Sequence, residues 1–225
     1  MEEIDHLTAP VNFAEVLKCE IKHIPVKRAF DICFSLISLI LCIPLFLVIG
    51  IAIYSSSRGK IIYSHERIGR GGKPFRCYKF RTMYPDAEVR LEEILKNNPE
   101  KLEEWEQTHK LKDDPRIIPV GAFLRKTSLD EFPQFWNVLK GDLSIVGPRP
   151  VVQEEVTKHL GMKAPKILSV RPGLTGIWQV SGRSDTSYIT RIELDEKYVD
   201  SHSFLLDLKL IAKTIPTMIS SKGAY

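Results

Sequence analysis

The sequence predicts an α+β fold that is attached to a membrane through an apolar helix near its beginning. Three observations lead to this prediction. The 225 residues are 44% hydrophobic, which is enough for the core of one large domain. Residues 32–57 form a run of 26 residues without a charge, longer than the roughly 20 residues that cross a bilayer. Short β-like runs within residues 60–80 are followed by helical patterns over most of the remaining chain.

The composition excludes several classes of protein. The chain is too apolar for a disordered protein, and 13 Gly and 14 Pro are too few for a fibrous one. A net charge of +4, with no recognisable nucleic-acid-binding module, predicts no nucleic-acid partner. Four cysteines lack C-x-x-C or zinc-ligand spacing, so we expect neither a disulfide scaffold nor a structural zinc site. These are Cys19, Cys33, Cys42 and Cys77.

The apolar run is expected to be a membrane anchor. Basic residues lie on both of its flanks, and the positive-inside rule then places both ends in the cytoplasm. Pro44 lies near the middle, where it lacks the N–H that a helix needs and bends the chain. A helix that enters the bilayer, breaks at Pro44 and returns to the same side satisfies both observations. A kinked helix that spans the bilayer once is the alternative. The flanking residues are Lys18, Lys22, Lys27 and Arg28 before the run, and Arg58, Lys60, Arg67 and Arg70 after it.

This anchor divides the chain into a polar or amphipathic segment 1–28, a re-entrant membrane helix 29–57 and a cytosolic domain 58–225. Residues 58–81 carry eight Lys or Arg and a single acid, Glu66. Two β-like runs here, Lys60–Ser64 and Phe75–Phe80, flank the turn signal Gly69–Pro74 and predict a basic hairpin. The hairpin would attract anionic headgroups, bind phosphorylated substrates, or do both.

Several amphipathic helices are predicted beyond the hairpin. Residues 86–112 form one such stretch, broken around Asn97–Pro99, with a solvated acidic face. Leu205–Ile219 forms another, which would lie either on the headgroups or in the core. A third helix is expected to start at Ser128 and to stop at Gly141.

The start of this third helix has two interpretations. Ser128 and Glu131 match the S-x-x-E capping box, and Asp130 is favoured at a helix N-terminus by the helix dipole. Alternatively, the adjacent carboxylates of Asp130 and Glu131 hold a divalent cation, or one of them attacks phosphorus. Arg125 and Lys126 lie just upstream.

Two segments with glycine and arginine could bind phosphate. Gly147–Pro150 is a rigid turn that carries Arg149, whose guanidinium suits bidentate contact with phosphate. Residues 170–183 contain three glycines between Arg171 and Arg183, so that backbone N–H groups and charge could both reach an anion. The alternatives are a structural turn and an ordinary glycine-rich loop.

Three blocks in this order resemble the bacterial sugar transferase family, the monotopic polyprenol-phosphate phosphoglycosyl transferases. They are KFRTM at Lys79–Met83, TSLDEFPQFWNVLKGDLSIVGPRP at Thr127–Pro150 and RPGLTGIWQVSGR at Arg171–Arg183. The resemblance extends from Val26 to the C-terminus. It is greatest to undecaprenyl-phosphate galactose or glucose phosphotransferases.

The resemblance implies a reaction at the bacterial cytoplasmic membrane. Such enzymes transfer a sugar 1-phosphate from a UDP-sugar to undecaprenyl phosphate, release UMP and start a polysaccharide or glycan, with Mg²⁺ and a covalent intermediate. Asp130 would be the nucleophile, and Glu131 would help it to hold the metal while capping its helix. The cations expected to screen the phosphates are Lys79, Arg81, Arg125, Arg149, Arg171 and Arg183.

One departure and two alternatives accompany this resemblance. The family often has Ser-Pro at the helix break, whereas this chain has Ile43-Pro44 and lacks a capping serine. A membrane-anchored adaptor that binds anionic lipid or a partner protein would not need the two carboxylates. Direct sugar transfer would release UDP in place of UMP. A homodimer is plausible, and the identity of the sugar is left open.

Overall fold

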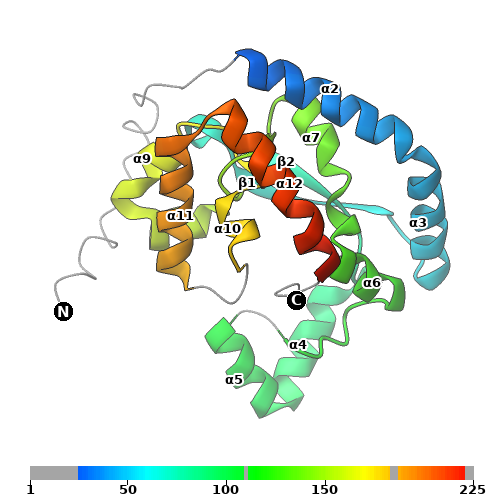
Figure 1. The fold of residues 1–225 in the computed structure, drawn as a ribbon. Helices are drawn as coiled ribbons and strands as arrows, with labels where there is room; N and C mark the ends of the chain where they lie inside the picture. The colour runs from blue at the N-terminus through cyan, green and yellow to red at the C-terminus, as the bar shows by residue number, and fades with distance from the viewer. Residues whose placement is uncertain (1–24, 109–110, 183–186, 221–225) are drawn as a thin grey trace, which may run out of the picture.

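The computed structural model describes residues 25–108, 111–182 and 187–220, and these form a mostly helical α+β fold with two small sheets (Figure 1). The N-terminal segment 1–24 lies outside the described residues. Helices α2 and α3 run along one side of the molecule, and α12 crosses the face beside them in Figure 1. The α+β prediction is confirmed.

The apolar run folds as two helices, α2 (Pro25–Leu41) and α3 (Ile43–Ser56), with a bend of 59° between them. The bend falls at Cys42, two residues before Pro44, because Pro44 has no N–H for the carbonyl of Ile40. Cys42 makes no side-chain capping bond. Within the described residues no single helix is long and apolar enough to cross a membrane, but this bent pair together meets that requirement.

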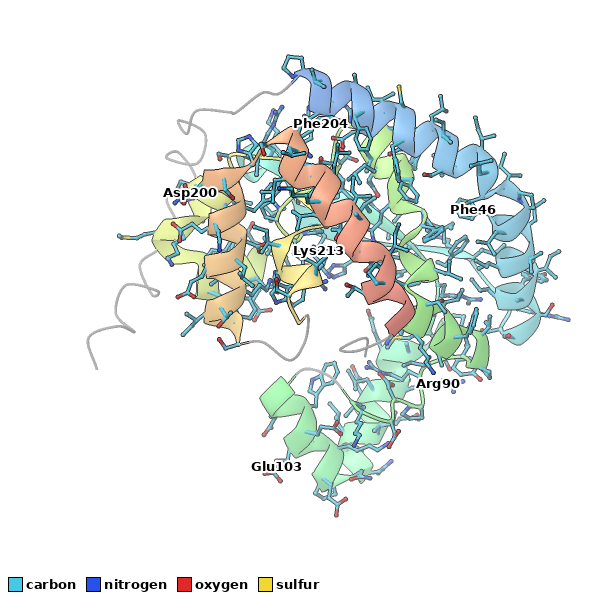
Figure 2. The ribbon with its side chains drawn as sticks, viewed as in Figure 1. Phe46, Arg90, Glu103, Asp200, Phe204 and Lys213 are labelled. Atoms are coloured by element: carbon cyan, nitrogen blue, oxygen red, sulfur yellow. The ribbon has the colours of Figure 1, made fainter. Side chains whose placement is uncertain are left out.

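The basic hairpin is confirmed, with a longer first strand than predicted. Strand β1 (Ile62–Ile68) pairs antiparallel with β2 (Pro74–Phe80) across a short turn, η2 (Arg70–Gly72). Gly71 and Gly72 have φ values of 70° and 74°, which glycine adopts without a steric penalty. Phe46 of α3, labelled in Figure 2, contacts Phe80 edge to face with ring centres 5.2 Å apart, so α3 packs on the hairpin.

The helix expected over residues 128–140 is in fact two elements. Helix α6 (Pro119–Thr127) leads into the single 3-10 turn η3 (Leu129–Glu131), and α7 (Gln134–Lys140) follows after Pro133. Gly141 ends α7 in the left-handed region at φ 90°, as the sequence predicted.

The second sheet explains two of the three glycines in the third block, Gly173 and Gly176. Strands β3 (Ser144–Val146) and β4 (Gly173–Thr175) are parallel, and their backbones almost touch. A Cβ on Gly173 would lie 2.1 Å from the backbone nitrogen of Gly147, and one on Gly176 would lie 2.3 Å from the oxygen of Gly147. Close packing of the two chain segments therefore requires these glycines without any ligand.

The remaining helices surround this centre. Helices α4 (Ala87–Asn97) and α5 (Pro99–Thr108) form the predicted broken pair, contain no buried residue among those described, and project from the body in Figure 1. The C-terminal half packs its core around Val156, Leu160, Ile167 and Ile192. Its elements are α8 (Gln153–Glu155), η4 (Val156–Leu160), η5 (Gly161–Lys163), α9 (Ala164–Ile167), α10 (Ile177–Val180), α11 (Tyr188–Ser201) and α12 (Phe204–Ser220).

Candidate active site

Asp130 lies on η3, in the tight connection between α6 and α7. Ser128 just before it has φ 57°, a left-handed conformation that is uncommon for a residue with a side chain. Its hydroxyl makes no capping hydrogen bond, so the capping-box prediction is wrong. A capping serine needs an extended backbone, whereas Ser128 ends α6 and begins η3 at once. The two carboxylates are therefore held in this turn by other contacts.

Lys79 of β2 is the cation beside these carboxylates. Its Nζ lies 2.6 Å from Glu131 Oε1 and 3.9 Å from Asp130 Oδ2. In the antiparallel register Lys79, Cys77 and Arg67 share one face of the hairpin, since side chains alternate along each strand. This face lies against η3, as the contact between Lys79 and Glu131 requires.

Burial is the largest influence on the pKa of the Asp130 carboxyl. Its residue is 8% exposed, and desolvation raises the pKa of its carboxyl to about 6, although Lys79 and Arg125 act in the opposite direction. The negative charge of Glu131 adds to the increase. At neutral pH most Asp130 side chains are ionised, yet they are poorly solvated, which suits a carboxylate nucleophile.

Arg125 approaches Asp130 from the end of α6. Its Nε donates to Thr82 Oγ1 at 2.9 Å, which fixes the half-buried guanidinium relative to the segment after β2. The positive charge of Arg125 is among the causes that stabilise ionised Asp130. Lys79 and Arg125 are thus the two predicted phosphate-binding residues that the structure brings to the carboxylates.

Arg149 lies on a second cluster, next to the same hairpin face. Its guanidinium carbon is 5.2 Å from the ring centre of Trp178, and Arg191 lies 5.3 Å from that ring. Arg191 also pairs with Glu155 at 3.1 Å. The charges of Arg149 and Arg67 both act on the buried thiol of Cys77, which lies two residues before Lys79 in β2. Arg149 is therefore close to the hairpin face that carries Lys79.

Two other predicted residues bond to backbone carbonyls away from Asp130. The guanidinium of Arg81 donates to the carbonyl of Arg58 at 3.1 Å and to that of Ser57. It therefore caps the C-terminal end of α3. Arg171 donates to the carbonyl of Gly141 at 2.9 Å, at the end of α7 opposite Asp130. Arg183 lies outside the described residues. Neither Arg81 nor Arg171 is placed to contact a phosphate held at Asp130.

The sequence prediction missed Asn137, which connects the site to the hairpin. Asn137 is fully buried; its Oδ1 accepts from Tyr78 N at 3.0 Å, and its Nδ2 donates to Arg76 O at 2.7 Å. These bonds hold the free edge of β2 against α7 and so position Lys79. An amide within the apolar run Phe135–Leu139 was the available signal, because a buried amide must find partners.

The donor set around Asp130 fits Mg²⁺. Mg²⁺ is usually held by one or two carboxylates together with substrate phosphates and water, and Asp130 and Glu131 supply the two carboxylates. No group of three or more His, Cys, Asp or Glu suited to a metal occurs among residues 25–108, 111–182 and 187–220. The two carboxylates would hold such a metal, and the phosphates of a bound substrate would supply further oxygen ligands.

The bent apolar helix pair, the basic hairpin and the buried carboxylate of Asp130 beside Lys79 suit a transferase that acts on phosphorylated substrates at a membrane. The sequence profile of the bacterial sugar transferase family matches residues 22–221, and the chain belongs to that family. The family resemblance is confirmed, and so is the interpretation of the chain as an enzyme of this class.

Curated relatives extend this result. "Exopolysaccharide production protein ExoY" of Sinorhizobium fredii is 48% identical over 199 residues, 88% of each chain. "Undecaprenyl-phosphate galactose phosphotransferase" of Salmonella typhimurium is 46% identical over 88% of this chain and 41% of its own length. "UDP-glucose:undecaprenyl-phosphate glucose-1-phosphate transferase" of Klebsiella pneumoniae is 37% identical over 88% of this chain, again 41% of the relative.

Proposed function

We propose that this protein transfers a hexose 1-phosphate from a UDP-sugar to undecaprenyl phosphate, releases UMP and so starts a surface polysaccharide. The names of the Salmonella and Klebsiella relatives support the donor and acceptor. The name of the Sinorhizobium relative supports the polysaccharide. The observation that carries the proposal is the buried Asp130 carboxylate between Lys79 and Arg125.

Two displacements at the same phosphorus make up the reaction. A carboxylate oxygen of Asp130 attacks the β-phosphorus, the bond to the bridging oxygen breaks, and UMP leaves with that oxygen and the bonding electrons. An oxygen of the lipid phosphate then attacks the same phosphorus and the bond to Asp130 breaks. The carboxylate is regenerated, and the product is a lipid diphosphate sugar.

The cations of the site lower the repulsion between the Asp130 carboxylate, the diphosphate of the UDP-sugar and the lipid phosphate. Lys79 and Arg125 face the carboxylates, and Arg149 lies on Trp178 with no carboxylate ion pair of its own in the described chain. Preorganised positive charge in a partly desolvated site stabilises charge that develops on the phosphoryl oxygens. Asp130 and Glu131 would hold Mg²⁺, which neutralises phosphate charge when bound.

The bent pair α2–α3 is proposed as a re-entrant anchor in the cytoplasmic leaflet of a bacterial inner membrane. Its outward side chains are large and apolar, and the basic hairpin follows it directly. With both ends on the cytoplasmic side, the catalytic domain lies at the headgroups, where the acceptor phosphate is.

The test is UMP release from a panel of UDP-sugars with undecaprenyl phosphate, Mg²⁺ and detergent-solubilised protein. We expect UMP with one donor, and a loss of at least about a thousandfold in Asp130→Asn, because removal of a nucleophile leaves only binding and electrostatic terms. Asp113→Asn, on an exposed loop, is the matched control. Release of UDP would indicate direct sugar transfer, and full activity of Asp130→Asn would contradict the covalent route.

A further inference from the structure

A basic pocket lies at the end of α7 opposite Asp130. Asp130 precedes α7, whereas Arg171 donates to Gly141, the residue after α7. Seven residues of helix separate the two places by about 10 Å at 1.5 Å per residue. The pocket is lined by Lys27, Arg28, Asp31, Arg70, Ser144, Val170, Arg171, Tyr198 and His202.

The pocket contains more positive charge than its carboxylates neutralise. Lys27 pairs with Asp207 at 2.7 Å. Asp31 is 1% exposed and accepts from Ser144 Oγ at 2.8 Å and Ile145 N at 3.1 Å. Three guanidinium groups then remain without an ion pair in the described part of the chain: Arg28, Arg70 and Arg171.

The bonds of these three arginines differ. Arg28 donates to the carbonyls of Val138 and Leu139 at 2.7 and 3.0 Å, and Arg171 donates to that of Gly141. For Arg70 no hydrogen bond is seen within the described residues. Burial and the charges of Arg70 and Arg28 lower the pKa of Arg171, so the guanidinium groups repel one another. An anion between them would relieve this repulsion.

The pocket lies where an apolar surface meets a charged one. Lys27 and Arg28 belong to the first turn of α2, and the helix beyond them exposes Leu36, Ile37 and Leu41. Phe30 contacts Phe204 edge to face at 5.4 Å, so the start of α12 is joined to the start of α2 (Figure 2).

We propose that this pocket binds the phosphate of an anionic phospholipid headgroup. If α2 and α3 lie in the bilayer, the pocket is at the depth of the headgroups, and a lipid phosphate can enter it while the acyl chains lie along α2. The proposal rests on the membrane placement proposed above. A phosphate here is separated from Asp130 by α7, so it fixes the depth and tilt of the enzyme and takes no part in the reaction.

Native mass spectrometry of the full chain in detergent tests this proposal. Phosphatidylglycerol or phosphatidylcholine is added, and the lipid retained per protein is counted. We expect the wild type to retain phosphatidylglycerol in preference, and Arg70→Gln to lose more than tenfold in affinity. Lys73→Gln is the matched control, since Lys73 is exposed, near in sequence and outside the pocket. Loss of one general surface charge would weaken phosphatidylglycerol binding by about fivefold in either variant.

The outcomes separate the proposals. Equal retention of phosphatidylglycerol by Arg70→Gln and Lys73→Gln would overturn the headgroup proposal. Loss of lipid retention in the presence of a low concentration of inorganic phosphate would also overturn it, and would indicate a site for free phosphate. UMP release in phosphatidylglycerol-free detergent is measured in parallel, and Arg70→Gln should keep it. Loss of lipid retention with intact UMP release supports the headgroup site. Wild-type protein that releases no UMP yet retains lipid would reject the enzyme proposal alone.

Discussion

Asp130 combines burial with two nearby cations, and in the proposed mechanism its pKa of about 6 makes the reaction depend on pH. The nucleophile must be ionised, and the pKa is raised from an ordinary value of 3.8. Activity is therefore complete above the raised pKa and falls as pH decreases through about 6. We expect kcat/KM for UMP release to decrease about tenfold per pH unit below that point.

Lys79→Gln provides the check on this assignment. Removal of the Lys79 charge takes away the largest influence that lowers the pKa of Asp130, so the acidic limb should move to higher pH. A limb that stays in place in Lys79→Gln, or one centred near 4 in the wild type, would contradict the assignment to Asp130.

Asn137 carries a structural prediction at the same scale. Asn137→Ala leaves the backbone N–H of Tyr78 and the carbonyl of Arg76 without their partner. We expect the free energy of unfolding to fall by about 2–4 kcal/mol, measured by denaturant titration in detergent. Asn97→Ala, on the exposed end of α4, should change it by less than about 0.5 kcal/mol. Equal effects would mean that Asn137 does not hold β2.

Among the elements, the bend between α2 and α3 decides how the proposed anchor would meet the membrane. Pro44→Ala restores the missing N–H, and a continuous helix over residues 25–56 becomes long enough to span a bilayer. We expect cysteines at Val26 and Ser56, in a background without the native cysteines, to be labelled from the same side in the Pro44 protein. In Pro44→Ala they should be labelled from opposite sides.

Ile43→Ala in the same double-cysteine background is the control, because it leaves the bend in place. Labelling from opposite sides in the Pro44 protein would show a kinked single span and reject re-entry.

Elements with a strong local signal were predictable from the sequence. Pro44 marked the break, Gly141 marked a helix end, and the turn signal at Gly69–Pro74 marked the hairpin. The 3-10 turn after Ser128 was not predictable from the sequence, because the S-x-x-E pattern favours a helix cap. In the structure Glu131 pairs with Lys79 of β2, a tertiary contact that the local sequence does not indicate. Arg81 and Arg171 were equally ambiguous, since a guanidinium serves a carbonyl as readily as a phosphate.

For the whole molecule, the exposed apolar surface of α2 and α3 predicts an attachment that salt does not release. At about 1 M salt the Debye length falls to about 3 Å, which removes the attraction between the basic hairpin and anionic headgroups but leaves hydrophobic burial intact. We expect the protein to remain in the membrane pellet after a high-salt wash and to be extracted by detergent. Release by salt alone would show that the basic surface is the only attachment.

Arg28 joins the anchor to the end of α7, and η3 with Asp130 precedes the other end of the same helix. A helix in a bilayer changes its tilt when the hydrocarbon layer becomes thinner or thicker. If α2 lies in the bilayer as proposed, such a change would move the carbonyl end of α7 through Arg28 and alter the height of the Asp130 carboxylate above the acyl chains. On the proposed placement, lipid tail length would influence turnover even though the reaction itself takes place outside the hydrocarbon.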